Sequence, residues 1–163
     1  MLGGIADESV VRNLAKAPWP YRESDAREFA ARLTEPLFPR FLITRARDAA
    51  LLGCAGVHRD ENDPHERELG YWIAPQHWGC GYATEAARAV LEVACMLGHT
   101  RVNASHFLDN PASGRVLEKL GFEPTGTIAP RHSCGRGEAP MAREYALDLC
   151  AWGVGERSRR EAA

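Results

Sequence analysis

Two glycines, Gly79 and Gly81, lie within a segment that reads Gln-His-Trp-Gly-Cys-Gly-Tyr-Ala-Thr over residues 76–84. The segment follows an apolar, strand-like run at residues 69–73 and opens a long amphipathic helix pattern. Glycine lets the backbone approach a ligand closely because no side chain intervenes. The first turn of a helix also presents unpaired N–H groups and the positive end of the helix dipole. This combination favours the binding of a phosphate.

Two common phosphate-binding motifs are incomplete in this segment. A P-loop ends in Gly-Lys followed by Ser or Thr, whereas residues 81–83 are Gly-Tyr-Ala. A dinucleotide-binding motif needs a third glycine and an acidic residue about 20 positions further on. Thr84 occupies the place of the third glycine, and the region around Leu97 offers no acid. A third pattern, Gln/Arg-x-x-Gly-x-Gly/Ala, fits in register from Gln76, and a glycine-rich turn without a ligand remains the alternative.

A second informative segment reads Asp-Asn-Pro-Ala-Ser over residues 109–113. Asn110 suits a helix N-cap, Pro111 the first helical position and Ser113 the third. These structural roles explain the segment without a ligand. The start of such a helix nevertheless lies at the carboxyl end of the preceding strand, where ligands bind in open α/β sheets. We therefore expect Asn110 and Ser113 to lie beside the glycine-rich turn.

Hydrophobic periodicity predicts mixed α and β structure in one domain, residues 1–154, with a disordered tail at residues 155–163. Helices are expected at residues 7–16, 24–33, 81–97 and 111–120, and strands at residues 40–46, 51–57, 66–74, 102–108, 122–128 and 143–149. The long helix should bury one apolar face, formed by Ala83, Ala87, Val90, Leu91, Ala94 and Leu97. Ser24 is expected to cap the second helix. The strand, helix, strand, helix order between residues 66 and 120 implies a parallel crossover.

Composition excludes several classes of function. The chain has 163 residues, a net charge of −2 and a sequence pI of about 6.3, which argues against a nucleic-acid partner. Apolar runs do not reach the length of a membrane span, and the N-terminus does not resemble a signal peptide. We therefore expect a cytoplasmic protein without a membrane partner. The five scattered cysteines indicate reduced, buried thiols and no metal site.

Residues 51–148 resemble the GNAT superfamily of N-acetyltransferases, and most closely its RimJ/RimL-type branch, which acetylates the N-termini of ribosomal proteins. The matching motifs lie at residues 68–73, 76–85, 109–113 and 117–122. The resemblance implies a central mixed, mostly antiparallel sheet with one parallel βαβ crossover and helices on both faces. Relatives usually open with a strand before the first helix. This chain begins almost at the helix, so the sheet edge is expected to be altered or covered by a partner, as in a homodimer.

The resemblance also implies acetyl-coenzyme A as co-substrate, an amine as acceptor and no metal. In relatives, the Gln/Arg-x-x-Gly-x-Gly/Ala loop binds the pyrophosphate of the coenzyme. The residues expected to bind the coenzyme are Ile73, Gln76, Trp78, Gly79, Cys80, Gly81, Tyr82, Ala83, Thr84, Asn110 and Ser113.

Acetyl transfer to an amine needs a base for the amine, a donor for the developing oxyanion and a proton for the leaving thiolate. Glu68 is our first candidate for the base, and the alternative is a solvated glutamate paired with a cation across the sheet. Glu66 and Glu138 follow it, and His65 and His106 are also available. Many relatives carry a Tyr seven residues after the Asn as the acid. That position is Leu117 here, so Ser113 is the nearest candidate.

The sequence says less about which residues bind the acceptor amine than about which residues bind the coenzyme. Trp19 and Tyr21 could stack on a substrate or anchor a loop by burial, and we favour the anchor. The polar loop at residues 131–138 could gate the acceptor groove or form a hairpin end. The acceptor could be a protein N-terminus or a small amine. A catalytically silent, coenzyme A-binding regulatory module is the alternative function.

Overall fold

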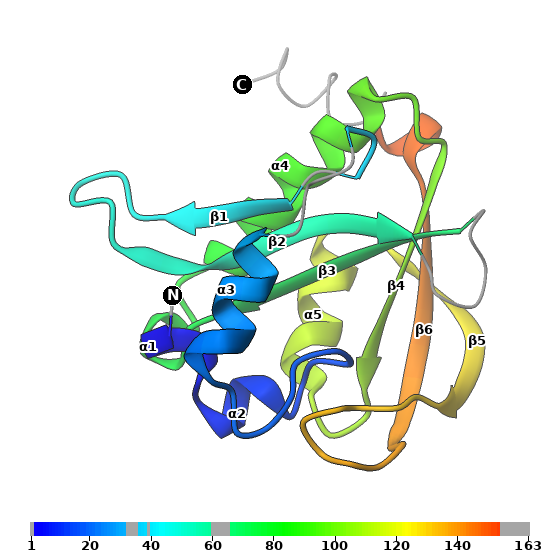
Figure 1. Cartoon of the computed structure of the whole chain (residues 1–163). Helices are drawn as coiled ribbons and strands as arrows, with labels where there is room; N and C mark the ends of the chain where they lie inside the picture. The colour runs from blue at the N-terminus through cyan, green and yellow to red at the C-terminus, as the bar shows by residue number, and fades with distance from the viewer. Residues whose placement is uncertain (1, 32–35, 39, 60–65, 154–163) are drawn as a thin grey trace.

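A computed structural model describes residues 2–31, 36–38, 40–59 and 66–153, and its described strands form one six-stranded sheet (Figure 1). The strand order is β1-β2-β3-β4-β6-β5. The strands are β1 Arg40–Thr44, β2 Leu51–Arg59, β3 Arg67–Ile73, β4 Arg101–Phe107, β5 Glu123–Pro130 and β6 Met141–Asp148. The helices are α1 Leu2–Ile5, α2 Glu8–Val11, α3 Glu23–Ala31, α4 Tyr82–Met96 and α5 Pro111–Lys119, with a 3-10 turn, η1, at Pro75–His77.

Strands β3 and β4 form the only parallel pair in the described sheet, and the other neighbours are antiparallel. This confirms the predicted crossover and the mixed, mostly antiparallel sheet. The parallel pair joins a single pair of partner residues, Glu68 and Asn103. Beyond that pair the two strands separate, which opens the centre of the sheet at their carboxyl ends.

Helices cover both faces of the sheet (Figure 1). Helices α4 and α5 pack on one face, where the larger hydrophobic core includes Val90, Leu91 and Leu117. The segments α1, α2 and α3 lie on the other face around a smaller core that includes Val11 and Tyr21. Side chains alternate between the two faces along a strand. Neighbouring residues of β3 therefore contribute to different sides of the sheet.

The long helix follows its predicted amphipathic pattern. Ala87, Val90, Leu91 and Ala94 are buried as expected, whereas Ala83 and Leu97 at its two ends are half-buried. The apolar stripe therefore covers the sheet only along the middle of the helix. An Asn side chain caps α5 and Pro occupies its first turn, as its sequence predicts.

The N-terminal helices differ from the prediction. The expected helix at residues 7–16 ends at Val11, and a separate short helix, α1, precedes it. The Asp7 side chain accepts the Ser9 N–H and starts α2 at Glu8. Ser24 does not cap α3, because this helix already begins at Glu23.

The carboxylate of Asp25 instead accepts the N–H of Arg22, 2.7 Å away, and so satisfies a donor at the start of α3. The expected end of this helix at residue 33 and the expected tail at residues 155–163 lie outside the described residues.

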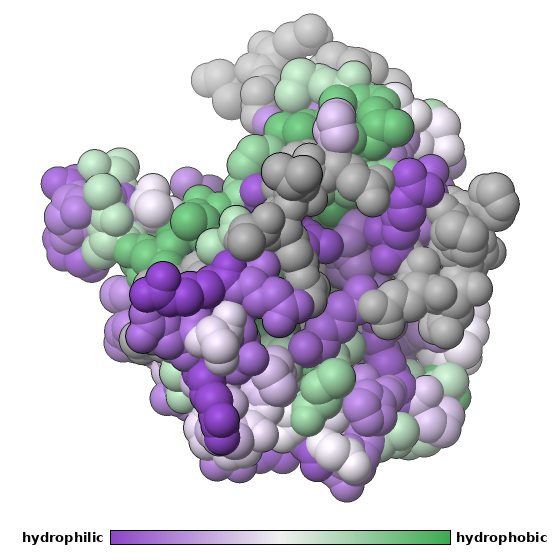
Figure 2. All heavy atoms as spheres, viewed as in Figure 1, coloured by the Kyte–Doolittle hydropathy of each residue, from purple (hydrophilic) through white to green (hydrophobic). Residues whose placement is uncertain are grey.

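The sheet ends in β1 on one side and β5 on the other. Within the described ranges no strand precedes α2. Edge strand β1 exposes the apolar side chains of Phe41 and Leu42. Figure 2 shows apolar surface along β1 and near α4, above a hydrophilic surface over α3.

All five cysteines are free. Cys54 is buried, as predicted, but Cys80, Cys134 and Cys150 are exposed, so the expectation of buried thiols is wrong for these three. Among the described helices, none combines the length and the apolar character that crossing a membrane requires.

Candidate functional site

The glycine-rich segment forms an open loop between β3 and α4. Gly79 and Gly81 adopt positive φ angles of 75° and 84°, and Gly81 is the N-cap of α4. A Cβ at either position would meet nothing within 4 Å, so the backbone conformation and not the available space requires glycine. The indole N–H of Trp78 donates to the Ile73 carbonyl, 2.7 Å away, and ties the loop to the end of β3.

Six consecutive backbone N–H groups, those of residues 79–84, have no acceptor within the part of the chain that the structure describes. The first backbone bond of α4 runs from the N–H of Glu85 to the carbonyl of Gly81. Residues 79–81 are exposed and residues 82–84 are half-buried. An array of free donors at a helix start, together with the helix dipole, can bind an anion.

A cavity of about 430 Å³ is lined by residues 68–72 of β3 and reaches both faces of the sheet. On the α3 side its lining includes Asp25, Phe29 and Glu68, and on the α5 side it includes Tyr71 and Ser113. Side chains from both faces can meet in one cavity because β3 and β4 separate beyond Glu68.

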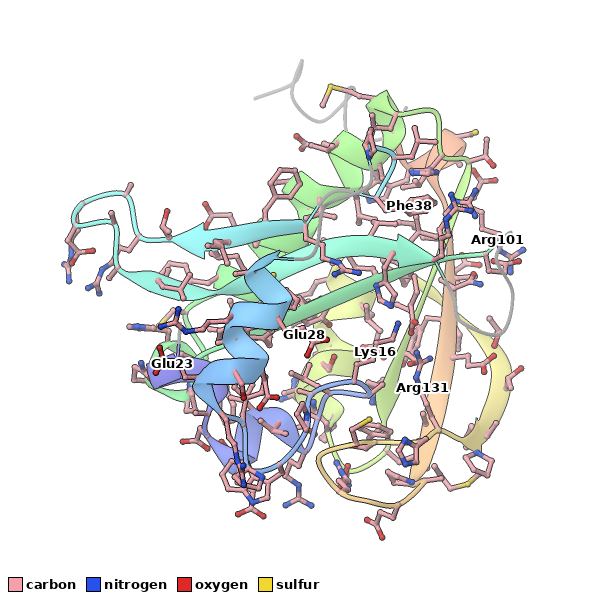
Figure 3. All side chains as sticks on the ribbon, viewed as in Figure 1. Lys16, Glu23, Glu28, Phe38, Arg101 and Arg131 are labelled. Carbon is pink, nitrogen blue, oxygen red and sulfur yellow. The ribbon has the colours of Figure 1, made fainter. Side chains whose placement is uncertain are left out.

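Figure 3 shows where the labelled charged side chains lie relative to this cavity. Lys16, Glu28 and Arg131 gather in front of the sheet, between α3 and β4, and all three line the cavity. The cavity therefore has charged groups at its α3 side and hydroxyl groups at its α5 side.

The predicted coenzyme-binding residues divide into two groups. Those of the loop, Gln76 and residues 78–84, are contiguous and do not line the cavity. Ser113 does line it, and Ile73 ends the strand between the two. The side chain of Asn110 is the N-cap of α5 and accepts the N–H of Ser113, 3.3 Å away.

A pair of hydroxyl groups joins α5 to β3. The Tyr71 hydroxyl of β3 lies 2.9 Å from Ser113 Oγ and 3.2 Å from the Ser113 carbonyl of α5. Burial raises the pKa of Tyr71 to about 12, so its hydroxyl stays protonated at neutral pH. Tyr71 was not identified from the sequence, although it lies inside the motif at residues 68–73.

Glu68 is buried and lies at the centre of a polar network in the cavity. Its Oε2 lies 2.6 Å from Arg131 Nη2 and 3.3 Å from His58 Nε2, and Ser105 Oγ donates weakly to Oε1 at 3.4 Å. Burial by itself would raise the pKa of Glu68. The hydrogen bonds and charges of His58 and Arg131 outweigh burial and lower it to about 2.

Glu68 combines features of the two alternatives that the sequence left open, a base in the site and a glutamate paired with a cation. Glu68 is paired with a cation, Arg131, yet it is buried and lines the cavity instead of lying on a solvated face. His58 was missed from the sequence. The signal for it was its place on β2, where it is the direct cross-strand partner of Glu68.

His106 lies on the α5 side of the cavity. Its Nδ1 is 2.8 Å from the Phe107 carbonyl, which can only accept, so Nδ1 carries the proton. Its Nε2 is 3.5 Å from the Tyr145 hydroxyl. His106 therefore has partners within the protein that the sequence did not reveal.

The other candidate bases are less well placed. Glu66 accepts a hydrogen bond from Asn103 Nδ2 at 2.6 Å and does not line the cavity. Glu138 is exposed and also lies outside the cavity lining. His65 lies outside the described residues.

The two aromatic residues considered for the acceptor side differ in burial. Tyr21 is buried and lines the cavity, so the expected anchoring role fits it. Trp19 is 42% exposed, so burial does not explain it.

The loop at residues 131–138 packs against the segment that follows α2. Ser133 Oγ donates to the Leu14 carbonyl at 2.9 Å, and the Cys134 N–H donates to the Ala15 carbonyl at 2.8 Å. Arg136 forms a bidentate ion pair with Asp109, at 2.7 and 2.9 Å, just before α5. The loop is thus a fixed wall of the site, joined to both the N-terminal segment and the start of α5.

Comparison with known proteins gives concordant matches. The family described as "Acetyltransferase (GNAT) domain" matches residues 4–123. The chain is 37% identical over 101 residues to the uncharacterised N-acetyltransferase YoaA of Bacillus subtilis (strain 168), a match that covers 61% of this chain and 57% of the relative. The chain spans about half the length of the curated relatives it matches.

Solved structures support the fold. The GNAT-family acetyltransferase of Bacillus anthracis superimposes with a TM-score of 0.75 at 24% identity, covering 90% of this chain and 86% of that one. The spermidine N-acetyltransferase of Vibrio cholerae, in complex with coenzyme A and spermine, gives a TM-score of 0.70 at 17% identity, with 90% and 86% covered. At these identities the likeness establishes the fold.

Proposed function

We propose, from the premise that this chain belongs to the GNAT acetyltransferase family, that it transfers an acetyl group from acetyl-coenzyme A to a primary amine. The observation that carries the proposal is the separation of β3 and β4. It opens a cavity that is lined from both faces of the sheet, and β3 runs from that cavity to the loop of free N–H donors. One substrate can then reach the opening from the α5 side and the other from the α3 side.

The loop donors are the proposed site for the pyrophosphate of coenzyme A. Pyrophosphate needs several donors and little steric hindrance, and the N–H groups of residues 79–84 supply the donors. From there the arm of the coenzyme would follow the end of β3 at Ile73 toward Ser113. Gln76, Trp78 and Asn110 are proposed to flank this path.

The backbone of β3 offers donors for the developing oxyanion. The Ala74 N–H donates to the Leu52 carbonyl of β2. Because backbone groups alternate in direction along an antiparallel strand, the N–H groups of Tyr71 and Ile73 point toward β4 instead. The parallel pairing ends at Glu68, so these two N–H groups face the opening between the strands.

Ser113 is the proposed donor to the leaving thiolate. Its hydroxyl lies in the cavity lining on the α5 side, where the coenzyme sulfur would arrive. Tyr71, 2.9 Å away, can donate to Ser113 Oγ and so leave the Ser113 proton directed at the sulfur.

Glu68 is proposed to assist deprotonation of the acceptor amine. Its carboxylate stays ionised at neutral pH and lines the α3 side of the cavity, where the amine would enter. A carboxylate with a pKa of about 2 is a weak proton acceptor. Glu68 therefore serves better by orienting the proton-accepting group than by keeping the proton itself.

The acceptor class is proposed from the lining of the cavity and from the motifs. Acidic and basic side chains are balanced there: Asp25, Glu28 and Glu68 against Lys16, Arg40 and Arg131. A polyamine site would need an excess of acidic groups, so we favour a monoamine, including a protein N-terminus as in the RimJ/RimL-type branch. We also propose that the protein is cytoplasmic. We further propose that it forms a homodimer in which the partner covers the apolar edge of β1.

The test is turnover of acetyl-coenzyme A by the full chain with a panel of small amines, polyamines and N-terminal peptides. Thiol release and the mass of the acetylated product are followed together. Acetylation of a panel amine supports the proposal. Binding of coenzyme A with no acetylated product from any class would instead favour the silent regulatory module.

A further inference from the structure

His58 lies on β2 directly opposite Glu68, and its imidazole shares the same face of the sheet. His58 Nε2 is 3.3 Å from Glu68 Oε2. The ionised carboxylate can only accept a hydrogen bond, so it favours the form of the ring that carries a proton on Nε2. In the neutral ring the lone pair is then on Nδ1.

The Nδ1 edge of His58 faces Gly70 of β3. A Cβ at Gly70 would lie 3.4 Å from Cε1 and 3.7 Å from Nδ1 of the imidazole. Gly70 itself lines the cavity, two residues beyond the last pairing of β3 with β4. The absence of a side chain there keeps Nδ1 open toward the place where the strands separate. Within the described ranges Nδ1 has no hydrogen-bond partner.

We propose that His58 accepts the proton of the acceptor amine, with Glu68 and Arg131 as the residues that position its ring. The inference rests on the proposed acetyl transfer and assigns its base. Arg131 holds the Glu68 carboxylate from one side at 2.6 Å, and the carboxylate holds His58 Nε2 from the other. A carboxylate that orients an imidazole fixes both its tautomer and its direction.

An imidazole suits this task better than the carboxylate. General base catalysis works best when the base titrates near the working pH, and imidazole ordinarily does so. Glu68 is strongly bound to Arg131 and is the poorer proton acceptor.

The step balances as follows. The amine nitrogen attacks the thioester carbonyl carbon, a C–N bond forms, and the amine proton passes to His58 Nδ1. The C–S bond breaks, and the sulfur leaves with its electron pair and takes the hydroxyl proton of Ser113, which Ser113 then regains from solvent. His58 returns its proton to solvent through the cavity.

The charged groups that line the cavity with His58 come from several elements. They are Glu68 on β3, Arg40 on β1, Arg131 after β5, Asp25 and Glu28 on α3, and Lys16 before α3. They are equal in number of each sign, and among the described residues the ion pair of the ring is with the Glu68 carboxylate.

The first test compares His58→Gln and His58→Ala with His99→Gln, a control after the end of α4 that lies outside the cavity lining. Both His58 variants should lose about 10²- to 10⁴-fold in kcat, the range that general base catalysis contributes. The acidic limb of the pH profile should disappear with them. Added imidazole should restore part of the rate to His58→Ala and none to His58→Gln, because only the smaller side chain leaves room. The control should keep the wild-type rate.

The second test does not depend on turnover. In ¹⁵N NMR of the full chain, neutral His58 should show the tautomer with the proton on Nε2, and Glu68→Gln should weaken that preference. Calorimetry should give unchanged coenzyme A affinity in the His58 variants. A proton on Nδ1 in the neutral ring, or wild-type turnover with an intact acidic limb in His58→Ala, would overturn the assignment. Absence of acetyl transfer in the wild type, with the expected tautomer observed, would instead count against the acetyl-transfer function.

Discussion

The imidazole of His106 lies directly against the backbone of Gly114: a Cβ at position 114 would be 2.7 Å from His106 Nε2. A Cβ atom essentially never lies this close to a non-bonded heavy atom, so β4 and α5 can pack at this distance only because residue 114 is glycine. The neighbouring residue in the chain is Ser113, which lines the cavity. The packing of His106 on Gly114 therefore sets the distance between α5 and the site.

The first prediction follows from this contact. Gly114→Ala would normally stabilise a helix by about 0.5–1 kcal/mol. Here the added methyl must displace His106 or α5, so we expect a lower unfolding temperature. We also expect a lower kcat, because a shift of α5 would move Ser113. Thermal unfolding and steady-state kinetics check both. The double variant Gly114→Ala with His106→Ala removes the obstructing ring and should be more stable than His106→Ala alone. A single variant as stable and as active as the wild type would contradict this account.

The second prediction concerns the glycine-rich loop. Gly81→Ala should weaken coenzyme A binding at least tenfold, because a left-handed φ of 84° is strained for alanine and the donors of residues 79–84 would turn away. Gly98 offers a matched control, since it has the same φ of 84° and equally open space at the end of α4. Gly98→Ala should lose similar stability and keep its affinity in calorimetry. Equal affinities for both variants and the wild type would remove the loop from the binding site.

The third prediction tests the hydroxyl pair. Ser113→Ala should lower kcat more than stability, because Asn110 still caps α5 through the backbone N–H of residue 113. Tyr71→Phe should also lower kcat, since it removes the donor that lies 2.9 Å from Ser113 Oγ. If Tyr71 acts through Ser113, the double variant should be no slower than Ser113→Ala, which a double-mutant cycle measures. Additive losses would show that the two hydroxyl groups act separately.

The sequence predicted those features that depend on local patterns. Strands, the parallel crossover, the cap at Asn110 and the free loop at Gly79 and Gly81 each follow from residues close together in the chain. The N-terminal helices were predicted less well, because the starts of α2 and α3 depend on single side-chain hydrogen bonds, accepted by Asp7 and Asp25.

The cavity lining could be predicted only in part. Glu68 and Ser113 were identified because they lie in recognisable motifs. His58 and Arg131 were not, because they reach Glu68 from strands and loops distant in sequence, and only the register of β2 against β3 brings His58 opposite it. Tyr71 lies within a motif, but its partner is on α5, 42 residues away.

The last prediction concerns Glu68, whose pKa is lowered from an ordinary value of 4.5 to about 2. A group with a lowered pKa in the folded state stabilises the protein above its unfolded pKa and loses that contribution as the pH falls through the folded pKa. Glu68→Gln should therefore lower the free energy of unfolding by about 2–3 kcal/mol at pH 7. The difference from the wild type should shrink as the pH falls from about 4.5 toward 2. Denaturant unfolding at a series of pH values measures it.

The same variant should lower kcat by about 10²-fold, because His58 loses the carboxylate that orients it. The rate should recover partly at high pH, where more of the acceptor amine is already neutral, and coenzyme A affinity should hardly change. Glu66→Gln is the matched control, since Glu66 is hydrogen-bonded to Asn103 and lies outside the cavity. If Glu66→Gln lost the rate and Glu68→Gln kept it, the base would have to be sought around Glu66, because Glu68 would then have no part in the removal of the amine proton.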